Sequence, residues 1–222
     1  MILIRSVGVL VYGDRRTSRK QEGTMSRPPV TETKDQRRLG FPFRSGRISL
    51  DFVATVAKRD MNDREMITDG ESLQTWLWVS GLPAAKDPID ESAVERARVL
   101  REAINRLTRA RVDETRPVPT DVEILNEAAQ RGVPFPKLDY DGLSVHPSAP
   151  VPVDQVLAIV ARDAVELFSG KYHDRIRRCL GHDCSLYFVD RSRQGVRRWC
   201  SMAACGEKAS SATYRKRHSG PA

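Results

Sequence analysis

The feature that most constrains this chain is its four cysteines, which fall into two pairs with the same spacing. Cys179 and Cys184 enclose four residues in CLGHDC, and Cys200 and Cys205 enclose four in CSMAAC. Two short-spaced pairs allow two turns to present four sulfurs to one ion, and thiolates suit the tetrahedral coordination of structural zinc. The spacing therefore predicts one structural Zn²⁺ held by all four cysteines.

Two disulfides, or four unrelated thiols, are the alternative interpretations of these cysteines. Disulfides usually accompany export from the cell. The N-terminal stretch MILIRSVGVLVYGD is a poor export signal, because Arg5 interrupts its apolar run and no small-residue cleavage pattern follows. His182 lies inside the first pair as a further candidate ligand, although four cysteines already satisfy the ion.

The positive charge of the chain lies in the same region as the cysteines. Residues 171–222 hold twelve Lys or Arg and four Asp or Glu, a net charge of +8, which equals the net charge of the whole chain. The preceding residues are therefore neutral overall. A neutral body followed by a basic region indicates a polyanionic partner.

The body is patterned mainly for helices. Apolar residues recur at helical spacing in five segments: 48–59, 69–81, 92–111, 120–132 and 153–170. Ser92 with Glu95, and Thr120 with Glu123, predict capping boxes at two helix starts, and Gly81 and Gly132 predict helix ends. The proline-rich segment 133–152 predicts a loop or an irregular hairpin around Asp141 and Gly142.

Three segments follow from this pattern. Residues 1–45 are rich in polar residues and prolines and show no period, so we interpret them as a disordered leader or as sequence upstream of a true start at Met25. Residues 46–170 form the predicted helical domain. Residues 171–218 form the predicted zinc finger, which gives a mainly α fold class with a small treble-clef-like module of knuckle, hairpin and helix.

Within the predicted finger, the stretch between the cysteine pairs has the pattern of a hairpin. We expect strands over 185–190 and 196–200 with a turn at 191–195, and Tyr187, Phe188 and Trp199 packed around the metal. The segment after Cys200 is patterned as a helix, with Ser201 as its N-cap.

The residues around the second cysteine pair resemble the CGNR-type zinc finger of bacteria. They match its run of aspartate, serine and arginine and its R-R-W-C-S-M-x-x-C-G motif: Asp190, Ser192, Arg193, Arg197, Arg198, Trp199, Cys200, Ser201, Met202, Cys205 and Gly206. ISLDFVATV, residues 48–56, resembles the L-D-F-V-N-T opening of the ABATE domain that is usually fused to this finger. The resemblance implies a bacterial stress-responsive transcription regulator whose finger binds DNA.

The chain departs from the family pattern at the motif that names it. Where the family has Cys-Gly-Asn-Arg, this chain has Glu207 and Lys208 after Cys205 and Gly206, and Gln194 stands near a turn where Asn is common. Lysine keeps the charge of arginine but loses its bidentate fork. We expect the metal site to tolerate these changes, whereas base reading at positions 207 and 208 is in question.

The basic residues of the predicted finger are the candidate DNA contacts. Lys208, Ser211 and Arg215 fall on one face of its last helix. The hairpin adds four arginines: Arg191, Arg193, Arg197 and Arg198. Such a surface suits the phosphate backbone of a duplex, with one or two helix side chains reading the major groove. A zinc-stabilised RNA-binding module or protein–protein adaptor remains the alternative.

The sequence favours a non-enzymatic protein. Four cysteine ligands leave no open position on the metal, and motifs such as H-E-x-x-H, G-x-S-x-G or a glycine-rich phosphate loop are absent from the sequence. We expect a cytoplasmic location without a membrane span, and a helical domain that senses a small-molecule effector or forms a homodimer. Phe52, Trp76 and Trp78 would serve as core or as pocket wall, and Asp51 would cap a turn or contact a ligand.

Overall fold

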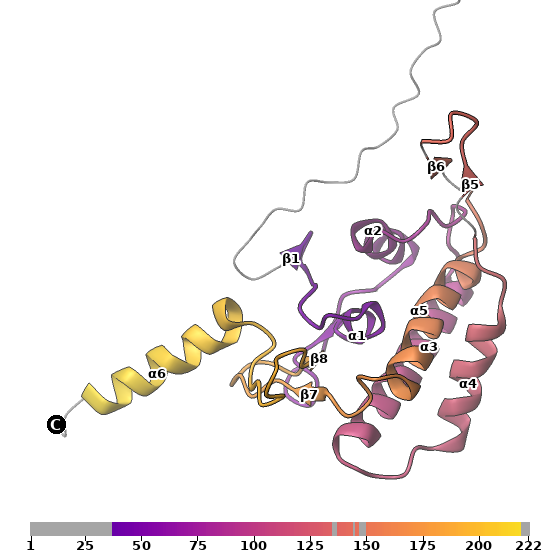
Figure 1. Cartoon of the computed structure of the whole chain (residues 1–222). Coiled ribbons are helices and arrows are strands. Elements are labelled where there is room, and N and C mark those ends of the chain that lie inside the picture. The colour runs from indigo at the N-terminus through magenta and orange to yellow at the C-terminus, as the bar shows by residue number, and fades with distance from the viewer. Residues whose placement is uncertain (1–36, 135–136, 144, 147–149, 219–222) are drawn as a thin grey trace, which may run out of the picture.

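The computed structural model describes residues 37–134, 137–143, 145–146 and 150–218 (Figure 1). Most of the expected leader therefore lies outside the described residues, as does the side chain of Arg215. Residues 37–45, which we assigned to the leader, belong to the folded body instead. They contain a strand pair, β1 (Arg37–Arg38) with β2 (Phe41–Pro42), and the side chain of Phe41 is buried.

The fold is mainly α, as expected from the apolar periodicity. The described helices are α1 (Ile48–Val53), α2 (Gly70–Ser80), α3 (Glu91–Val112), α4 (Pro119–Gln130), α5 (Val153–Ser169) and α6 (Glu207–His218). Three further antiparallel strand pairs are short: β3 (Val56–Ala57) with β4 (Arg64–Glu65), β5 (Lys137–Leu138) with β6 (Val145–His146), and β7 (Ile176–Arg178) with β8 (Tyr187–Val189). The β5–β6 hairpin turns at Gly142, as its sequence predicts.

One helix ends as the sequence predicts, whereas two helices begin differently from the prediction. α2 ends at Gly81 in a left-handed conformation, as expected. Both predicted capping boxes are wrong, because α3 is capped by Asp90, whose carboxylate accepts the Ala93 N–H, and α4 begins with Pro119 at its first position. A carboxylate cap and an N-terminal proline each satisfy the first turn without the reciprocal pair.

α1 is half as long as its apolar pattern predicts. The Thr55 hydroxyl donates to the Phe52 carbonyl, and the chain then enters β3 instead of adding a second helical turn. Lys58 adopts a positive φ of 57° at the following turn. A β-branched residue that bonds the backbone locally competes with helix propagation.

One hydrophobic core lies between α1, α2, α3 and α5, and α4 covers α3 and α5 (Figure 1). Phe52 and Trp76 are fully buried at its centre, with ring centroids 4.8 Å apart. Trp78 is partly buried and packs against the same core. The aromatic residues therefore act as core, and the ligand-binding alternative for them is not supported by their burial.

The β7–β8 hairpin belongs to this core as well. Ile176, Tyr187 and Val189 are buried among residues of the helical body. The Val189 N–H donates to the Ser45 carbonyl at 2.8 Å. The C-terminal module is therefore joined to the body by shared packing and by backbone hydrogen bonds.

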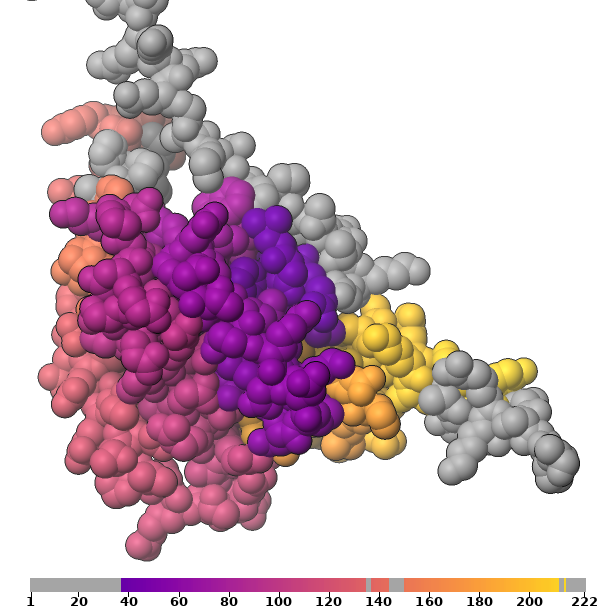
Figure 2. Space-filling model, turned by 180° about the vertical axis from the view of Figure 1, so that it is seen from behind, coloured from indigo at the N-terminus to yellow at the C-terminus, as the bar shows by residue number. Residues whose placement is uncertain are grey.

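α6, by contrast, projects away from the body (Figures 1 and 2). Its main packing contact is with the turn Met202–Gly206 that leads into it. Within the described part of the chain, no helix combines the length and the apolar character that a membrane crossing requires.

Candidate metal centre

The first cysteine pair occupies the turn between β7 and β8. The Cys179 N–H donates to the Leu186 carbonyl at 2.8 Å, and the Cys184 N–H donates to Gly181 at 3.1 Å. The strand partner of β8 thus precedes the first cysteine, and the prediction that 185–190 pairs with 196–200 is wrong. Residues 196–200 contain no strand.

The second cysteine pair is brought across the first by irregular backbone. The Leu180 N–H donates to the Arg198 carbonyl at 2.9 Å, which places Cys200 over the knuckle. Ser201 then caps the following turn, where its hydroxyl accepts the Ala204 N–H at 3.4 Å. The predicted N-cap at Ser201 is confirmed, and Cys205 lies in the turn that it caps.

The four sulfurs form a cluster with the size of a zinc–thiolate tetrahedron. Each lies within 4.8 Å of the others. The Cys200 sulfur is 3.8 Å from that of Cys184 and 3.7 Å from that of Cys205. Zn–S bonds of about 2.3 Å in a tetrahedron place neighbouring sulfurs about 3.8 Å apart. The separations are far longer than the roughly 2 Å of a disulfide bond, so the disulfide interpretation fails.

The electrostatics of the cluster also favour a cation. Hydrogen bonds from Cys184 and Cys200 lower the pKa of Cys179 to about 2. The hydrogen bond with Cys179 raises the pKa of Cys184 to about 12, and hydrogen bonds with Cys179 and Cys184 raise the pKa of Cys200. Four thiolates at this separation require a compensating charge, which a zinc ion supplies.

Backbone N–H groups donate hydrogen bonds to one of the sulfurs, and a glycine lets the two cysteine pairs approach each other closely. The N–H groups of Gly181 and Cys200 each lie 3.4 Å from the Cys179 sulfur. A Cβ atom at Gly181 would lie 3.0 Å from the Cys205 sulfur and 3.2 Å from Cβ of Cys184. Glycine at this position therefore allows the two cysteine pairs to meet.

An apolar shell surrounds the sulfurs. Phe188, Leu186 and Ala54 form one buried cluster with the cysteines, and Trp199 packs against it. Ala54 comes from the end of α1, so the helical body supplies part of this shell. His182 is outside the sulfur cluster, with a 98% exposed side chain that pairs with Asp183.

Asp190 holds the loop that follows β8. Its carboxylate accepts the Ser192 N–H at 2.9 Å and the Arg197 N–H at 2.7 Å. Burial raises the pKa of Asp190, but these hydrogen bonds outweigh burial, and the net pKa is lowered. A buried ionised carboxylate thus folds residues 191–197 into a compact loop beside the metal centre.

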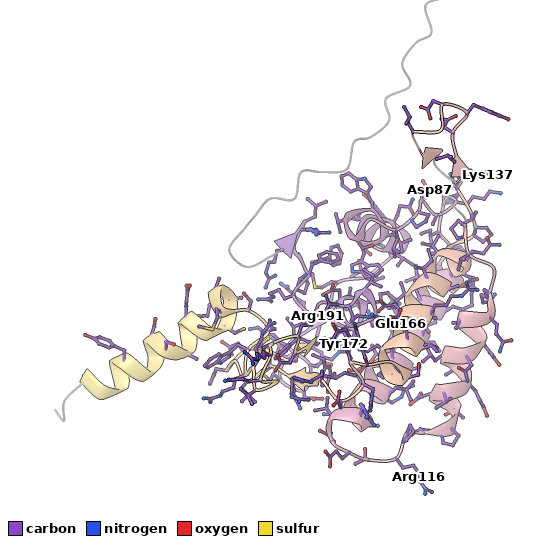
Figure 3. All side chains as sticks on the ribbon, in the orientation of Figure 1. Asp87, Arg116, Lys137, Glu166, Tyr172 and Arg191 are labelled. Carbon is purple, nitrogen blue, oxygen red and sulfur yellow. The ribbon has the colours of Figure 1, made fainter. Side chains whose placement is uncertain are left out.

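The candidate DNA-contacting residues fall into two groups. Arg191 donates to the Gly46 carbonyl at 2.7 Å and stacks on Tyr172 (Figure 3), and Arg197 donates to the carbonyls of Trp199 and Cys200. Arg191 thus joins the finger to the body, and Arg197 stabilises the finger itself. Arg191 and Arg197 are exposed all the same, as are the remaining described candidates: Arg193, Arg198, Lys208 and Ser211.

A further basic cluster was not expected from the sequence. Arg37, Arg44, Lys58 and Arg64 line a hollow of about 310 Å³ together with Asp183 and Cys184. The cations come from the body, and Cys184 comes from the metal centre. These cations are more than one hundred residues from the cysteine motif in the sequence. Only the folding of the chain therefore brings the cations next to Cys184.

Comparisons with known proteins agree with this architecture. The family model ABATE, described as "Putative stress-induced transcription regulator", matches residues 46–171. The model of the CGNR zinc finger matches residues 175–218. A search of curated proteins gave no match. Together with the cysteine cluster, these findings support one structural zinc ion in the C-terminal module.

Proposed function

The chain belongs to the ABATE family of transcription regulators and carries a CGNR zinc finger, and on that basis we propose that it is a zinc-dependent DNA-binding regulator. Cys179, Cys184, Cys200 and Cys205 are the proposed zinc ligands. Bound zinc would cross-link the knuckle to the turn that starts α6 and would leave no open position for catalysis. Neither matched family is an enzyme family.

The observation that carries this proposal is the placement of α6. The helix begins two residues after Cys205 and extends away from the body, with Lys208 and Ser211 exposed (Figure 1). A helix that projects from a rigid anchor can enter the major groove, which is about 12 Å wide. The metal would thus fix the direction of the proposed recognition helix.

The phosphate backbone is the proposed partner of the other exposed cations. Arg193 and Arg198 lie on the loop beside the metal centre, and Lys58 and Arg64 lie in the hollow next to Cys184. Contacts of this kind determine register and affinity but carry no sequence information. We assign Arg215 to the same helix surface from its position in α6 alone.

Base reading is proposed to depend on α6 residues other than the family's asparagine and arginine. Glu207 and Lys208 replace that pair here, and both are exposed in the first turn of α6. A carboxylate accepts a hydrogen bond from cytosine N4, and a lysine donates to guanine. The proposed contacts therefore differ in kind from those of an Asn–Arg pair.

The helical domain, residues 46–170, is proposed to sense an effector or to form a homodimer, while residues 171–218 bind DNA. A protein of this type acts in the cytoplasm. The second candidate function is a zinc-stabilised RNA-binding or protein–protein adaptor module. The exposed basic surface favours a nucleic acid over a protein as the partner. Cations that neutralise phosphates release the counterions of a duplex, and this release favours binding.

The test is a selection from random-sequence DNA duplexes with zinc-loaded protein. We expect an enriched motif, and we expect Lys208→Ala, which leaves every cysteine intact, to weaken or change that motif. Cys205→Ser, with zinc content measured on both proteins, removes a ligand as the metal control. Binding without any enriched motif, or equal binding to RNA, would contradict a sequence-specific DNA regulator and favour the second candidate.

A further inference from the structure

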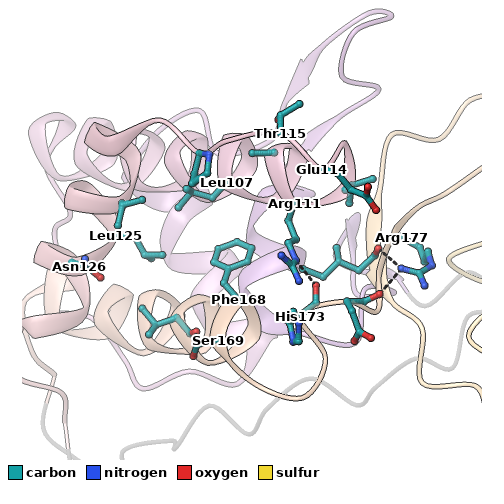
Figure 4. Close-up of a pocket in the computed structure, with 17 residues that line it drawn as sticks. Leu107, Arg111, Glu114, Thr115, Leu125, Asn126, Phe168, Ser169, His173 and Arg177 are labelled. Atoms are coloured by element: carbon teal, nitrogen blue, oxygen red, sulfur yellow. Dashed lines mark hydrogen bonds between the residues drawn. The ribbon is translucent and has the colours of Figure 1, made fainter.

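A cavity of about 650 Å³ lies where the helical body meets the zinc finger (Figure 4). Its walls come from the end of α3, the α3–α4 loop, α4, the end of α5, the α5–β7 linker and the start of β7. This volume is within the range of sites that bind small molecules. The cavity is separate from the metal centre and from the basic hollow beside it, because the residues that line it differ.

The interior of the cavity is apolar. Leu107, Leu125 and Phe168 face it from three different helices (Figure 4), and Ile176 faces it from β7. Leu107, Leu125 and Ile176 are also members of the buried core. A rigid hydrophobic floor with a few polar groups at one side is the usual construction of a site for an apolar molecule with a polar head.

The polar group best placed to bind a ligand is Arg111. Its Nε donates to the His173 carbonyl at 2.9 Å, which fixes the guanidinium beside the Phe168 ring (Figure 4). Within the described residues, the terminal nitrogens of Arg111 have no protein acceptor. Arg177, the other arginine of the cavity, already donates to the carbonyls of Asp174, Ile176 and Gly195.

An arginine with two free terminal nitrogens matches the geometry of a carboxylate, which accepts a bidentate pair of hydrogen bonds. The acidic residues of the cavity are Glu114 and Asp174. Both are exposed, and Glu114 lies on the side of Arg111 away from Phe168 (Figure 4). A ligand carboxylate placed between Arg111 and Phe168 therefore meets the guanidinium on the side away from Glu114.

We propose that this cavity binds a small amphipathic carboxylate, with its hydrocarbon or aromatic body against Phe168 and its carboxylate on Arg111. The site gives the effector-sensing role of the proposed function a location and a ligand class. Binding to the cavity stands without DNA binding, whereas its regulatory meaning rests on the proposed function.

The position of the cavity couples it to the metal centre. Ile176 and Arg177 form its wall and also begin β7, which leads directly into Cys179. β7 is held by pairing with β8 and by core packing. A ligand against Ile176 adds contacts that favour one placement of β7, and a ligand can shift an equilibrium only through such differential contacts.

Calorimetric titration of the full-length zinc-loaded protein tests the site, with 2-naphthoate as the probe and the neutral 2-naphthamide as its isosteric control. We expect the carboxylate to bind roughly tenfold more tightly than the amide, as a charge-assisted hydrogen bond implies. Arg111→Gln should abolish this preference, and Arg116→Gln should keep it. Arg116 is exposed, lies in the loop that follows α3 and does not line the cavity (Figure 3).

Val122→Trp provides a second, independent variant, because it places a large ring in the cavity from a partly exposed position on α4. We expect it to abolish binding of both probes while the circular dichroism spectrum and the zinc content stay unchanged. Equal affinity for naphthoate and naphthamide, or an unchanged preference in Arg111→Gln, would overturn the carboxylate assignment. Undiminished binding to Val122→Trp would overturn the site.

Hydrogen exchange tests the coupling without DNA. Naphthoate should slow exchange of the β7 and β8 amides in the wild type and should leave it unchanged in Arg111→Gln. Unchanged exchange in the wild type at saturating naphthoate would overturn the coupling. A failure of the proposed DNA-binding function would leave both the titration and the exchange results intact, so the two failures can be told apart.

Discussion

Asp51, at the residue scale, is a carboxyl group buried in the body. Its Oδ1 atom is 3.1 Å from the Ser45 N and 2.7 Å from the Ser45 Oγ, so it caps this turn, as the structural alternative in the sequence predicts. The same Oγ is 2.7 Å from the Arg47 carbonyl. A hydroxyl has one proton, so the Asp51 carboxyl and the Arg47 carbonyl share it as acceptors. Burial raises the pKa of Asp51 to about 7, although the hydrogen bonds from Ser45 lower it.

This pKa predicts a pH-dependent loss of stability. A carboxyl whose folded pKa exceeds its unfolded pKa of about 4 stabilises the fold when protonated, and this contribution is lost as pH rises from about 4 through about 7. Asp51→Asn should remove the dependence. Its free energy of unfolding, minus that of the wild type, should rise across this range by up to about 4 kcal/mol. Denaturant titrations of both proteins at several pH values measure this difference.

The control for this prediction is Asp113→Asn, a substitution of the same kind at an exposed residue. Its difference from the wild type should stay flat over the same pH range. A flat difference for Asp51→Asn as well would show that Asp51 is ionised in the folded protein throughout.

Gly181 gives a second prediction at this scale. A methyl group there meets the Cys205 sulfur at 3.0 Å and must push the two cysteine pairs apart. Gly181→Ala should weaken zinc binding by about 1–3 kcal/mol, the usual cost of overpacking. Competition with a chromogenic chelator measures the affinity. Gly132→Ala is the matched control, because a Cβ there meets nothing within 4 Å; equal affinities of the two variants would argue against this steric role.

At the scale of elements, the loop after β8 depends on one carboxylate rather than on a strand pair. Asp190→Asn replaces an acceptor with an amide donor and leaves one of the N–H groups of Ser192 and Arg197 without its partner. We expect a loss of about 1–3 kcal/mol and faster hydrogen exchange over residues 191–198. Asp183→Asn, at an exposed position inside the first cysteine pair, should leave both quantities unchanged. Unaltered exchange in Asp190→Asn would contradict the role of this carboxylate.

The helices show where sequence periodicity works and where it fails. α2, α3 and α5 lie close to their predicted ranges, because each carries a continuous apolar face over three or more turns. The helix predicted over 48–59 ends at Val53, because the local hydrogen bond of Thr55 and the pairing of β3 with β4 compete with further helix. Apolar residues at helical spacing are also compatible with a short strand over such a span.

At the scale of the whole molecule, the finger and the body share packing, so zinc should stabilise both. Ile176 and Tyr187 of the finger lie in the main core, and Ala54 of the body lies in the cluster around the cysteines. Arg59 adds a link, since its N–H donates to the Ser185 hydroxyl while its side chain pairs with Glu102. Loss of the metal therefore removes support from the body.

Chelation of zinc tests this coupling. In Trp199→Phe, the remaining tryptophans, Trp76 and Trp78, report only on the body. We expect chelation to lower the melting temperature that these two residues report, because a ligand that binds only the folded state adds its binding free energy to stability. Readdition of zinc should restore it. A body transition that chelation does not move would show that the finger folds as a separate unit.

The sequence by itself determined the chemistry of this protein. The spacing of the cysteines predicted a tetrathiolate cluster, and the periodicity of 69–81, 92–111 and 153–170 predicted three helices, because both signals are local and repeat along the chain. The replacement of the family's Asn–Arg pair by Glu207 and Lys208 was equally visible in the sequence.

Only the tertiary structure decided which distant segments of the chain come into contact. It paired β8 with β7 rather than with 196–200, placed Lys58 and Arg64 beside Cys184, and joined α3, α4, α5 and β7 around the cavity that contains Arg111. These relations join residues far apart in the chain. They follow from which apolar faces are buried together, and no local pattern records that choice.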